Sequence, residues 1–273
     1  MGDSFGSGTG AGDYQEGTAG NCFRSANSYS EVVVKKLRER GRRVNFTNVT
    51  CSGSAISTLR QSFKGESPQF DALKWGTDLV LLSIGGTDIG FAGYGGVCIQ
   101  ADCSGEPTRA ILDAMPQMGE NLTTLLRDIQ ERSPRAKIIL TGYGRPLTAG
   151  PNAEGVQHDP ICDPAVFTPE ERRQGNTVLE RVDATLRSAA DAARAQDVNV
   201  DFVSPFIDSV RLQPSFEGHA LCESGAPFYR GLDALGQEGP EAILHLNRAG
   251  QAALADLVRR NVPPSLGHGG FLP

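Results

Sequence analysis

Runs of apolar residues in this chain alternate with segments in which apolar residues recur at helical spacing. Continuous apolar runs that end in glycine or proline occur at 77–86 (TDLVLLSIGG), 136–144 (AKIILTGYG) and 198–205 (VNVDFVSP). Such runs are typical of strands buried on both faces of a sheet. Residues 42–50 (RRVNFTNVT) alternate between apolar and polar side chains, which predicts a half-buried strand.

Between these runs, apolar residues follow the period of an amphipathic helix. The pattern predicts a helix from near Tyr29 to Gly41, a second over Met115–Arg132, a third over 168–196 and a last one capped by Asn247. Strands that alternate with helices indicate an α/β fold, a three-layer αβα sandwich whose parallel sheet is covered on both faces.

Length and composition narrow the class of protein. A chain of 273 residues can bury a large core, and we expect a single domain over 1–273 with a flexible tail at 263–273. No apolar run is long enough to cross a bilayer, so no integral membrane segment is expected. The net charge of −6 would repel a phosphate backbone, which argues against a nucleic-acid partner. We expect a monomer that acts on a small molecule or lipid.

The number and spacing of the cysteines indicate whether the protein is exported or cytosolic. None of the six lies in a CxxC motif or in a cluster with histidine at zinc spacing, so no metal site is predicted. Their even number favours three disulfides in an exported protein, although reduced cysteines in a cytosolic enzyme stay an alternative. The chain itself begins without the basic and apolar segments of a signal peptide.

Residues that could bind or react with a ligand follow the ends of several expected strands. Open parallel sheets bind ligands at the carboxyl ends of their strands. Gly53, the segment 85–88 (GGTD) and the segment 142–145 (GYGR) each follow an expected strand. Ser4, in the glycine-rich opening, should follow one as well, yet only three residues precede it. We therefore expect that the first strand of the sheet is missing from this chain.

Four short blocks resemble those of a known enzyme family. They are GDSFGSG at 2–8, CSGSA at 51–55, IGGTDIGF at 84–91 and LHLNRAGQAALA at 244–255. In order and spacing they are similar to the four blocks of the SGNH (GDSL-type) hydrolases, above all the secreted, disulfide-bonded lipases and esterases of the streptomycete type. The resemblance spans nearly the whole chain and implies a flavodoxin-like parallel sheet and the hydrolysis of carboxylic esters without a cofactor.

The resemblance also implies a catalytic pair. Ser4 falls on the nucleophile and His245 on the catalytic histidine, and a serine hydroxyl needs such a base to remove its proton as it attacks. Many members carry an aspartate where this chain has Ala242, so we expect a Ser-His dyad. In it, a main-chain carbonyl near Ala242 or Ile243 accepts the imidazole N–H. The other histidines are expected on the surface or in packing roles: His158, His219 and His268.

The same resemblance supplies donors for the oxyanion of the tetrahedral intermediate. They are the main-chain N–H groups of Ser4 and Gly53 and a side chain from the third block. Here the chain departs from the family, because Thr87 stands where an asparagine is usual. A threonine hydroxyl can donate but is shorter than a carboxamide. Thr87 therefore acts directly, through a water, or not at all.

Further residues have expected structural roles. Asp3 and Asp88 resemble family aspartates that bind main-chain amides around the site. The relatives pair neighbouring cysteines, which implies the disulfides Cys22–Cys51, Cys98–Cys103 and Cys162–Cys222. A loop over 91–107 is expected to line the substrate pocket, with Phe91 and Tyr94 in its wall.

Three other functions were weighed. Gly6, Gly8 and Ala11 fit a dinucleotide-binding G-x-G-x-x-[GA] pattern, but no helix pattern follows directly, so this signal is weak. A non-catalytic SGNH-like binding domain would explain Thr87, the missing acid and the missing strand. An acyltransferase would use the same residues as a hydrolase, with an alcohol as acceptor.

Overall fold

The computed structural model describes residues 1–266 and contains a parallel sheet. The three strongest apolar runs form its strands, β1 (Leu79–Leu82), β2 (Lys137–Thr141) and β3 (Val200–Val203), in the order β1-β2-β3. Leu82 pairs with Leu140, which in turn pairs with Phe202. The fold class expected from the alternation of strands and helices is thus confirmed.

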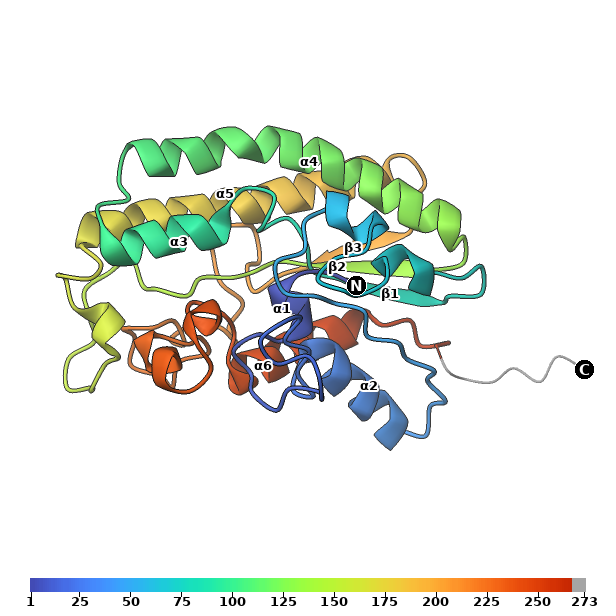
Figure 1. Cartoon of the computed structure of the whole chain (residues 1–273), viewed down its shortest axis with the longest axis horizontal. Helices are drawn as coiled ribbons and strands as arrows, with labels where there is room; N and C mark the ends of the chain where they lie inside the picture. The colour runs from blue at the N-terminus through green and yellow to red at the C-terminus, as the bar shows by residue number, and fades with distance from the viewer. Residues whose placement is uncertain (267–273) are drawn as a thin grey trace, which may run out of the picture.

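Helices cover both faces of this sheet (Figure 1). On one face α2 (Tyr29–Glu39) packs against α6 (Arg248–Asn261), and α6 also contacts β2 and β3. On the other face α3 (Phe91–Gln100), α4 (Glu106–Arg132) and α5 (Pro169–Arg194) lie together, with α5 against β3. The layered αβα arrangement leaves the strands largely buried between two helical layers.

Short elements connect the layers. One four-residue helix, α1 (Ser4–Ser7), precedes α2. Single turns of 3-10 helix occur at Ser57–Arg60, Gln69–Ala72, Pro160–Cys162, Leu232–Gly236 and Pro240–Ala242.

Capping residues explain where the long helices begin. The Thr168 side chain accepts from the Glu171 N–H while the Glu171 carboxylate accepts from the Thr168 N–H, so α5 starts with a reciprocal capping box. Helix α4 begins nine residues before the expected Met115, and Pro116 lies inside it. The start of this helix was therefore expected too late in the sequence, because a proline within a helical pattern usually marks a helix boundary.

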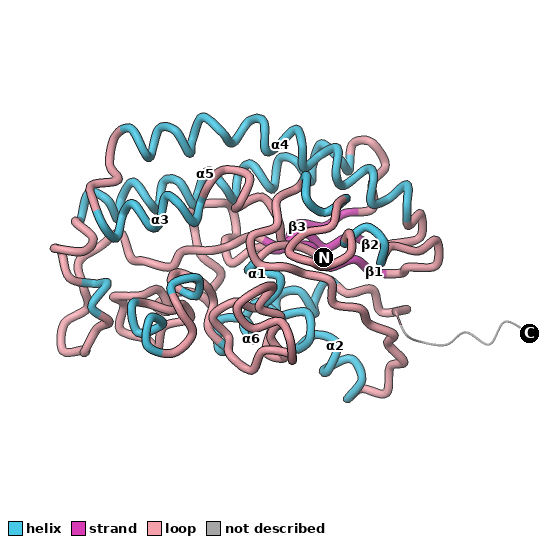
Figure 2. Tube along the Cα trace, viewed as in Figure 1, coloured by secondary structure: helices cyan, strands magenta, loops and turns pink. Residues whose placement is uncertain are grey.

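The strand expected over 42–50 is wrong: these residues form no strand and are drawn as loop in Figure 2. A strand needs a hydrogen-bonded neighbour, and among residues 1–266 none pairs with 42–50. Gly2 bridges Ser83 beyond β1 and accepts from the Cys51 N–H at 3.0 Å. Residues 43–50 instead line a cavity of about 540 Å³, which Leu79–Leu81 also line.

The first residues of the expected tail make contacts with the rest of the chain. Residues 263–266, expected within the flexible tail, form a turn whose Pro263 and Leu266 carbonyls both accept from the Arg42 guanidinium at 3.2 Å. Residues 267–273, with His268, lie outside the described residues. Over residues 1–266 the chain contains no helix with the length and apolar character needed to cross a membrane.

Candidate active site

Ser4 is the first residue of α1, and its position is fixed by the aspartate before it. The Asp3 carboxylate caps the helix by accepting from the N–H groups of Phe5 at 3.0 Å and Gly6 at 3.5 Å. Gly8, with φ of 82°, ends the helix after a single turn in the left-handed conformation that glycine tolerates. The Ser4 side chain stays half-exposed while Asp3 is buried.

The imidazole of His245 meets this serine although the two residues lie at opposite ends of the chain. His245 Nε2 is 2.7 Å from Ser4 Oγ, and His245 Nδ1 is 3.2 Å from the carbonyl oxygen of Ile243. A carbonyl oxygen can only accept, so Nδ1 carries the proton and donates it. Nε2 is then free to accept the serine O–H, which is the tautomer that a general base requires.

The backbone around His245 holds the ring in this orientation. Leu244 has a φ of 62°, a left-handed conformation that is uncommon for a leucine. Hydrogen bonds on either side stabilise it, because the Leu244 N–H donates to the Arg230 carbonyl and the Arg230 N–H donates to the His245 carbonyl, both at 2.9 Å. Two residues on, Asn247 caps α6 by accepting from Ala249 and Gly250.

Burial keeps the imidazole neutral. Desolvation lowers the pKa of His245 to about 4. The ring of Phe5 lies 4.8 Å from the imidazole ring, centroid to centroid. At the expected aspartate position the buried Ala242 offers no carboxylate, and the neighbouring Glu241 is exposed. The Ile243 carbonyl therefore occupies the place that a carboxylate would take.

The expected oxyanion donors lie on turns that the two aspartates anchor. Gly53 has a φ of 84° and is exposed, and in the described part of the chain neither its N–H nor that of Ser4 donates to a main-chain acceptor. The Asp88 carboxylate accepts from the Ile56 N–H at 3.1 and 3.2 Å, joining the Thr87 turn to the segment after Gly53. Thr87 itself is exposed.

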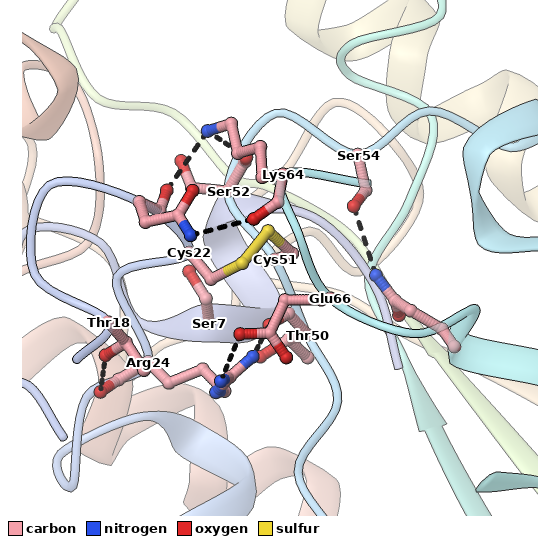
Figure 3. The surroundings of a disulfide bond; sticks show 12 residues. Ser7, Thr18, Cys22, Arg24, Thr50, Cys51, Ser52, Ser54, Lys64 and Glu66 are labelled. Atoms are coloured by element: carbon pink, nitrogen blue, oxygen red, sulfur yellow. Dashed lines mark hydrogen bonds and ion pairs between the residues drawn. A yellow bond between two sulfur atoms is a disulfide. The ribbon is translucent and has the colours of Figure 1, made fainter. Parts of the chain in front are cut away.

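The three cysteine pairs implied by the family resemblance are disulfide-bonded in the structure: Cys22–Cys51, Cys98–Cys103 and Cys162–Cys222. Figure 3 shows the first of these bonds, and its Cys51 lies two residues before Gly53 in the sequence. Beside it the Lys64 ammonium donates to the carbonyls of Asn21 at 3.0 Å and Ser52 at 2.8 Å. The disulfide and Lys64 thus fasten the same two segments together.

An apolar cavity lies beside the histidine loop. It has a volume of about 30 Å³, and its lining includes Phe91, Tyr94 and Leu244. The expected loop over 91–107 is wrong in part, since Phe91–Gln100 is the helix α3. The sequence FAGYGGVCIQ contains three glycines, which disfavour a helix, but Cys98 is tied to Cys103 and α3 packs against α4.

The other histidines of the described region lie in local contacts away from Ser4. His158 Nε2 is 2.8 Å from the Ala153 carbonyl oxygen, and His219 stacks on Phe228 with ring centroids 4.0 Å apart. Within residues 1–266 no group of three or more histidine, cysteine, aspartate or glutamate side chains has the arrangement of a metal site.

Sequence reasoning missed one residue that contacts the site. Tyr143 is buried two residues after the end of β2, and its hydroxyl donates to Asp3 Oδ2 at 2.6 Å and accepts from the Gly86 N–H at 2.8 Å. Its place in the GYGR segment, at the carboxyl end of an expected strand, was the available signal. Nothing in the sequence pattern showed which residues it would reach.

Comparisons with known proteins identify a family and similar enzymes. The model of the GDSL-like Lipase/Acylhydrolase family matches residues 1–253. The chain is 31% identical over 234 residues to a lipase of Streptomyces rimosus, covering 84% of this chain and 74% of that protein. It is 26% identical to Lipase 1 of Streptomyces coelicolor, covering 86% and 76%.

Solved structures show the same fold. The extracellular lipase of Streptomyces rimosus superposes with a TM-score of 0.67 at 27% identity, covering 95% of this chain and 96% of that one. Phospholipase A1 of Streptomyces albidoflavus superposes with a TM-score of 0.69 at 22% identity, covering 95% of each chain. At this identity the similarity supports the fold alone. The family model together with the first relative is decisive: the chain belongs to the GDSL-like lipase/acylhydrolase family of carboxylic ester hydrolases.

Proposed function

We propose that this protein hydrolyses carboxylic esters through a Ser4–His245 dyad and an acyl-enzyme intermediate. The observation that carries the proposal is the 2.7 Å contact between Ser4 Oγ and His245 Nε2, with Nδ1 held by the Ile243 carbonyl. A nucleophile within hydrogen-bond reach of a base, and a third group that orients the base, is the arrangement that activates a serine.

The steps follow from this arrangement. Ser4 Oγ attacks the ester carbonyl carbon while its proton passes to His245 Nε2. The C–O bond to the alcohol then breaks, and His245 returns the proton to the leaving alkoxide. Water attacks the acyl-enzyme next, gives its proton to His245, and the acid leaves as Ser4 recovers its proton.

The charge that develops on the carbonyl oxygen needs donors, and Ser4 and Gly53 N–H groups are proposed for this role. Neither N–H donates to a main-chain acceptor in the described residues, so no such hydrogen bond has to break when the oxyanion forms. The Thr87 hydroxyl is proposed as the third donor. Asp3 and Asp88 hold the surrounding turns in place.

The substrate is proposed to be a lipid or small-molecule ester. Its acyl group would lie against the apolar wall that contains Phe91, Tyr94 and Leu244, the last of which adjoins His245. Disulfides form and persist in oxidising compartments, and a similar lipase is described as extracellular, so we propose that the protein is secreted.

A fluorophosphonate probe and short-chain p-nitrophenyl esters test the proposal. The probe should label Ser4, and the esters should turn over. Ser4→Ala should abolish labelling and lower kcat by roughly 10⁶-fold, and His245→Ala should lower it by a similar factor. Failure of the wild-type protein to react with either reagent would instead indicate a non-catalytic binding domain. Transfer of the acyl group to an added alcohol in preference to water would identify an acyltransferase.

A further inference from the structure

A single buried hydroxyl connects two parts of the site that are far apart in sequence. Tyr143 Oη donates to Asp3 Oδ2 at 2.6 Å and accepts from the Gly86 N–H at 2.8 Å. Asp3 caps the nucleophile helix, and Gly86 directly precedes Thr87. The side chain of Tyr143 is 5% exposed, so water does not compete freely for these bonds.

The phenol stays protonated, so it can donate one hydrogen bond while its oxygen accepts another. Burial raises the pKa of Tyr143 well above its ordinary value of 10, with the Asp3 carboxylate as a further cause. The phenol therefore keeps its one proton and donates it to the ionised Asp3 carboxylate, while its oxygen accepts from the Gly86 N–H. A phenylalanine at this position could fill neither role.

Packing allows the ring to make these contacts. A Cβ added to Gly86 would lie 3.3 Å from the Tyr143 Cζ and Oη atoms, which shows how closely the ring approaches this turn. The ring also meets Phe5 edge-on, with centroids 4.7 Å apart, and Phe5 lies 4.8 Å from the ring of His245. Tyr143 thus touches the nucleophile turn, the third-block turn and the residue packed on the base.

We propose that Tyr143 is a positioning residue for ester hydrolysis, which sets the nucleophile turn and the Gly86–Thr87 turn at the separation that the transition state requires. The inference rests on the proposed function. Tyr143 reaches the reaction only through Asp3, Gly86 and Phe5. It should consequently affect the rate of acyl transfer and leave substrate affinity unchanged.

The test is Tyr143→Phe, which removes the hydroxyl and keeps the ring. We expect kcat for a p-nitrophenyl ester to fall on the order of ten- to hundredfold with KM unchanged, because small displacements of reacting groups have effects of this size. Hydrogen exchange of the Gly86 amide should become faster in the same variant. The matched control is Tyr29→Phe, which deletes another buried hydroxyl, one that accepts from Ser83 at 3.2 Å and forms no hydrogen bond with a proposed site residue among residues 1–266.

The outcomes separate this inference from the function on which it rests. A Tyr143→Phe enzyme with wild-type kcat and a lowered Tm, like the Tyr29→Phe control, would show a purely structural role. A rise in KM at constant kcat would also overturn the inference, since Tyr143 would then serve binding. A wild-type protein without esterase activity would overturn the proposed function first and this role with it.

Discussion

A main-chain carbonyl, that of Ile243, orients the proposed base in this protein. It selects the tautomer of His245 as well as a carboxylate would, because both groups only accept hydrogen bonds. It carries no full charge, however, so it stabilises the imidazolium that forms during the reaction less strongly. Catalysis by such a dyad depends correspondingly more on the oxyanion donors.

The lowered pKa of His245 predicts activity into the acid range. A group whose pKa falls from 6.5 to about 4 stays unprotonated, and thus able to accept the serine proton, at pH values where an ordinary histidine is charged. We expect kcat/KM to decline below about pH 5, with a midpoint near the His245 pKa of about 4. A profile of kcat/KM against pH checks this.

Asp3, a second buried group near the site, also titrates within the pH range of this profile. Desolvation raises the pKa of Asp3 to about 7, and the Tyr143 hydrogen bond opposes the shift. The profile should therefore be repeated in Asp3→Asn, which has no proton to exchange at this position. A midpoint near pH 6.5 in both proteins would show that burial does not depress the pKa of the base.

Thr87 offers a test of the third oxyanion donor. Thr87→Val keeps the shape of the side chain and removes the hydroxyl. If that hydroxyl donates, kcat should fall roughly 10²-fold or somewhat less, the lower end of what the loss of one such donor costs. The exposed position predicts an unchanged Tm. Thr87→Ser should retain activity, and equal rates for the valine and wild-type enzymes would exclude the hydroxyl from the mechanism.

At the scale of secondary-structure elements, the site is built from element ends. Ser4 begins α1, and His245 lies just before the cap of α6. The turn with Thr87 follows β1, and Tyr143 follows β2. Such positions combine a rigid support with free main-chain N–H groups, so the helices and strands fix the geometry while the turns carry the chemistry.

The cap of α6 should couple helix stability to the base. Asn247 accepts from the N–H groups of Ala249 at 2.9 Å and Gly250 at 3.0 Å. Asn247→Ala should lower the free energy of unfolding by about 1 kcal/mol, the usual cost of a lost cap. It should also lower kcat several-fold because His245 lies two residues away. Urea unfolding and ester turnover measure the two effects.

A second substitution at this position provides the control. Asn247→Asp keeps a capping oxygen and should restore both stability and turnover. A fully active alanine variant with reduced stability would show that the cap supports the helix without influencing His245.

At the scale of the whole molecule, covalent links bring distant segments to the site. The disulfide Cys22–Cys51 spans 29 residues and joins the loop after the nucleophile turn to the turn with Gly53. A crosslink of this span typically stabilises a protein by about 3–4 kcal/mol. Both sulfurs belong to buried residues, so the bond is part of the core as well as of the site.

Removal of this bond should therefore affect both stability and rate. In Cys22→Ala/Cys51→Ala we expect a markedly lower Tm and a lower kcat at temperatures where the protein is still folded, because Gly53 is no longer fixed relative to Ser4. Cys98→Ala/Cys103→Ala breaks a link that spans only 5 residues and serves as the comparison, with a smaller stability loss expected. Equal effects on kcat in the two double variants would contradict the proposed role.

The sequence by itself determined the layered α/β fold, three of the strands and the residues to examine at the site. Apolar periodicity depends on local burial and can be read residue by residue. The strand over 42–50 failed because alternation predicts a strand only if a neighbour pairs with it, and pairing is not a local property. The helix α3 was missed for a related reason: it is supported by a disulfide and by packing on α4.

Only the tertiary structure decided how the site is assembled. It brought Ser4 within 2.7 Å of His245 across nearly the full length of the chain and selected the Ile243 carbonyl from the two that the sequence left open. It also placed the Tyr143 hydroxyl between Asp3 and Gly86. These contacts depend on the relative placement of separate elements, which packing of the whole core determines and no local pattern records.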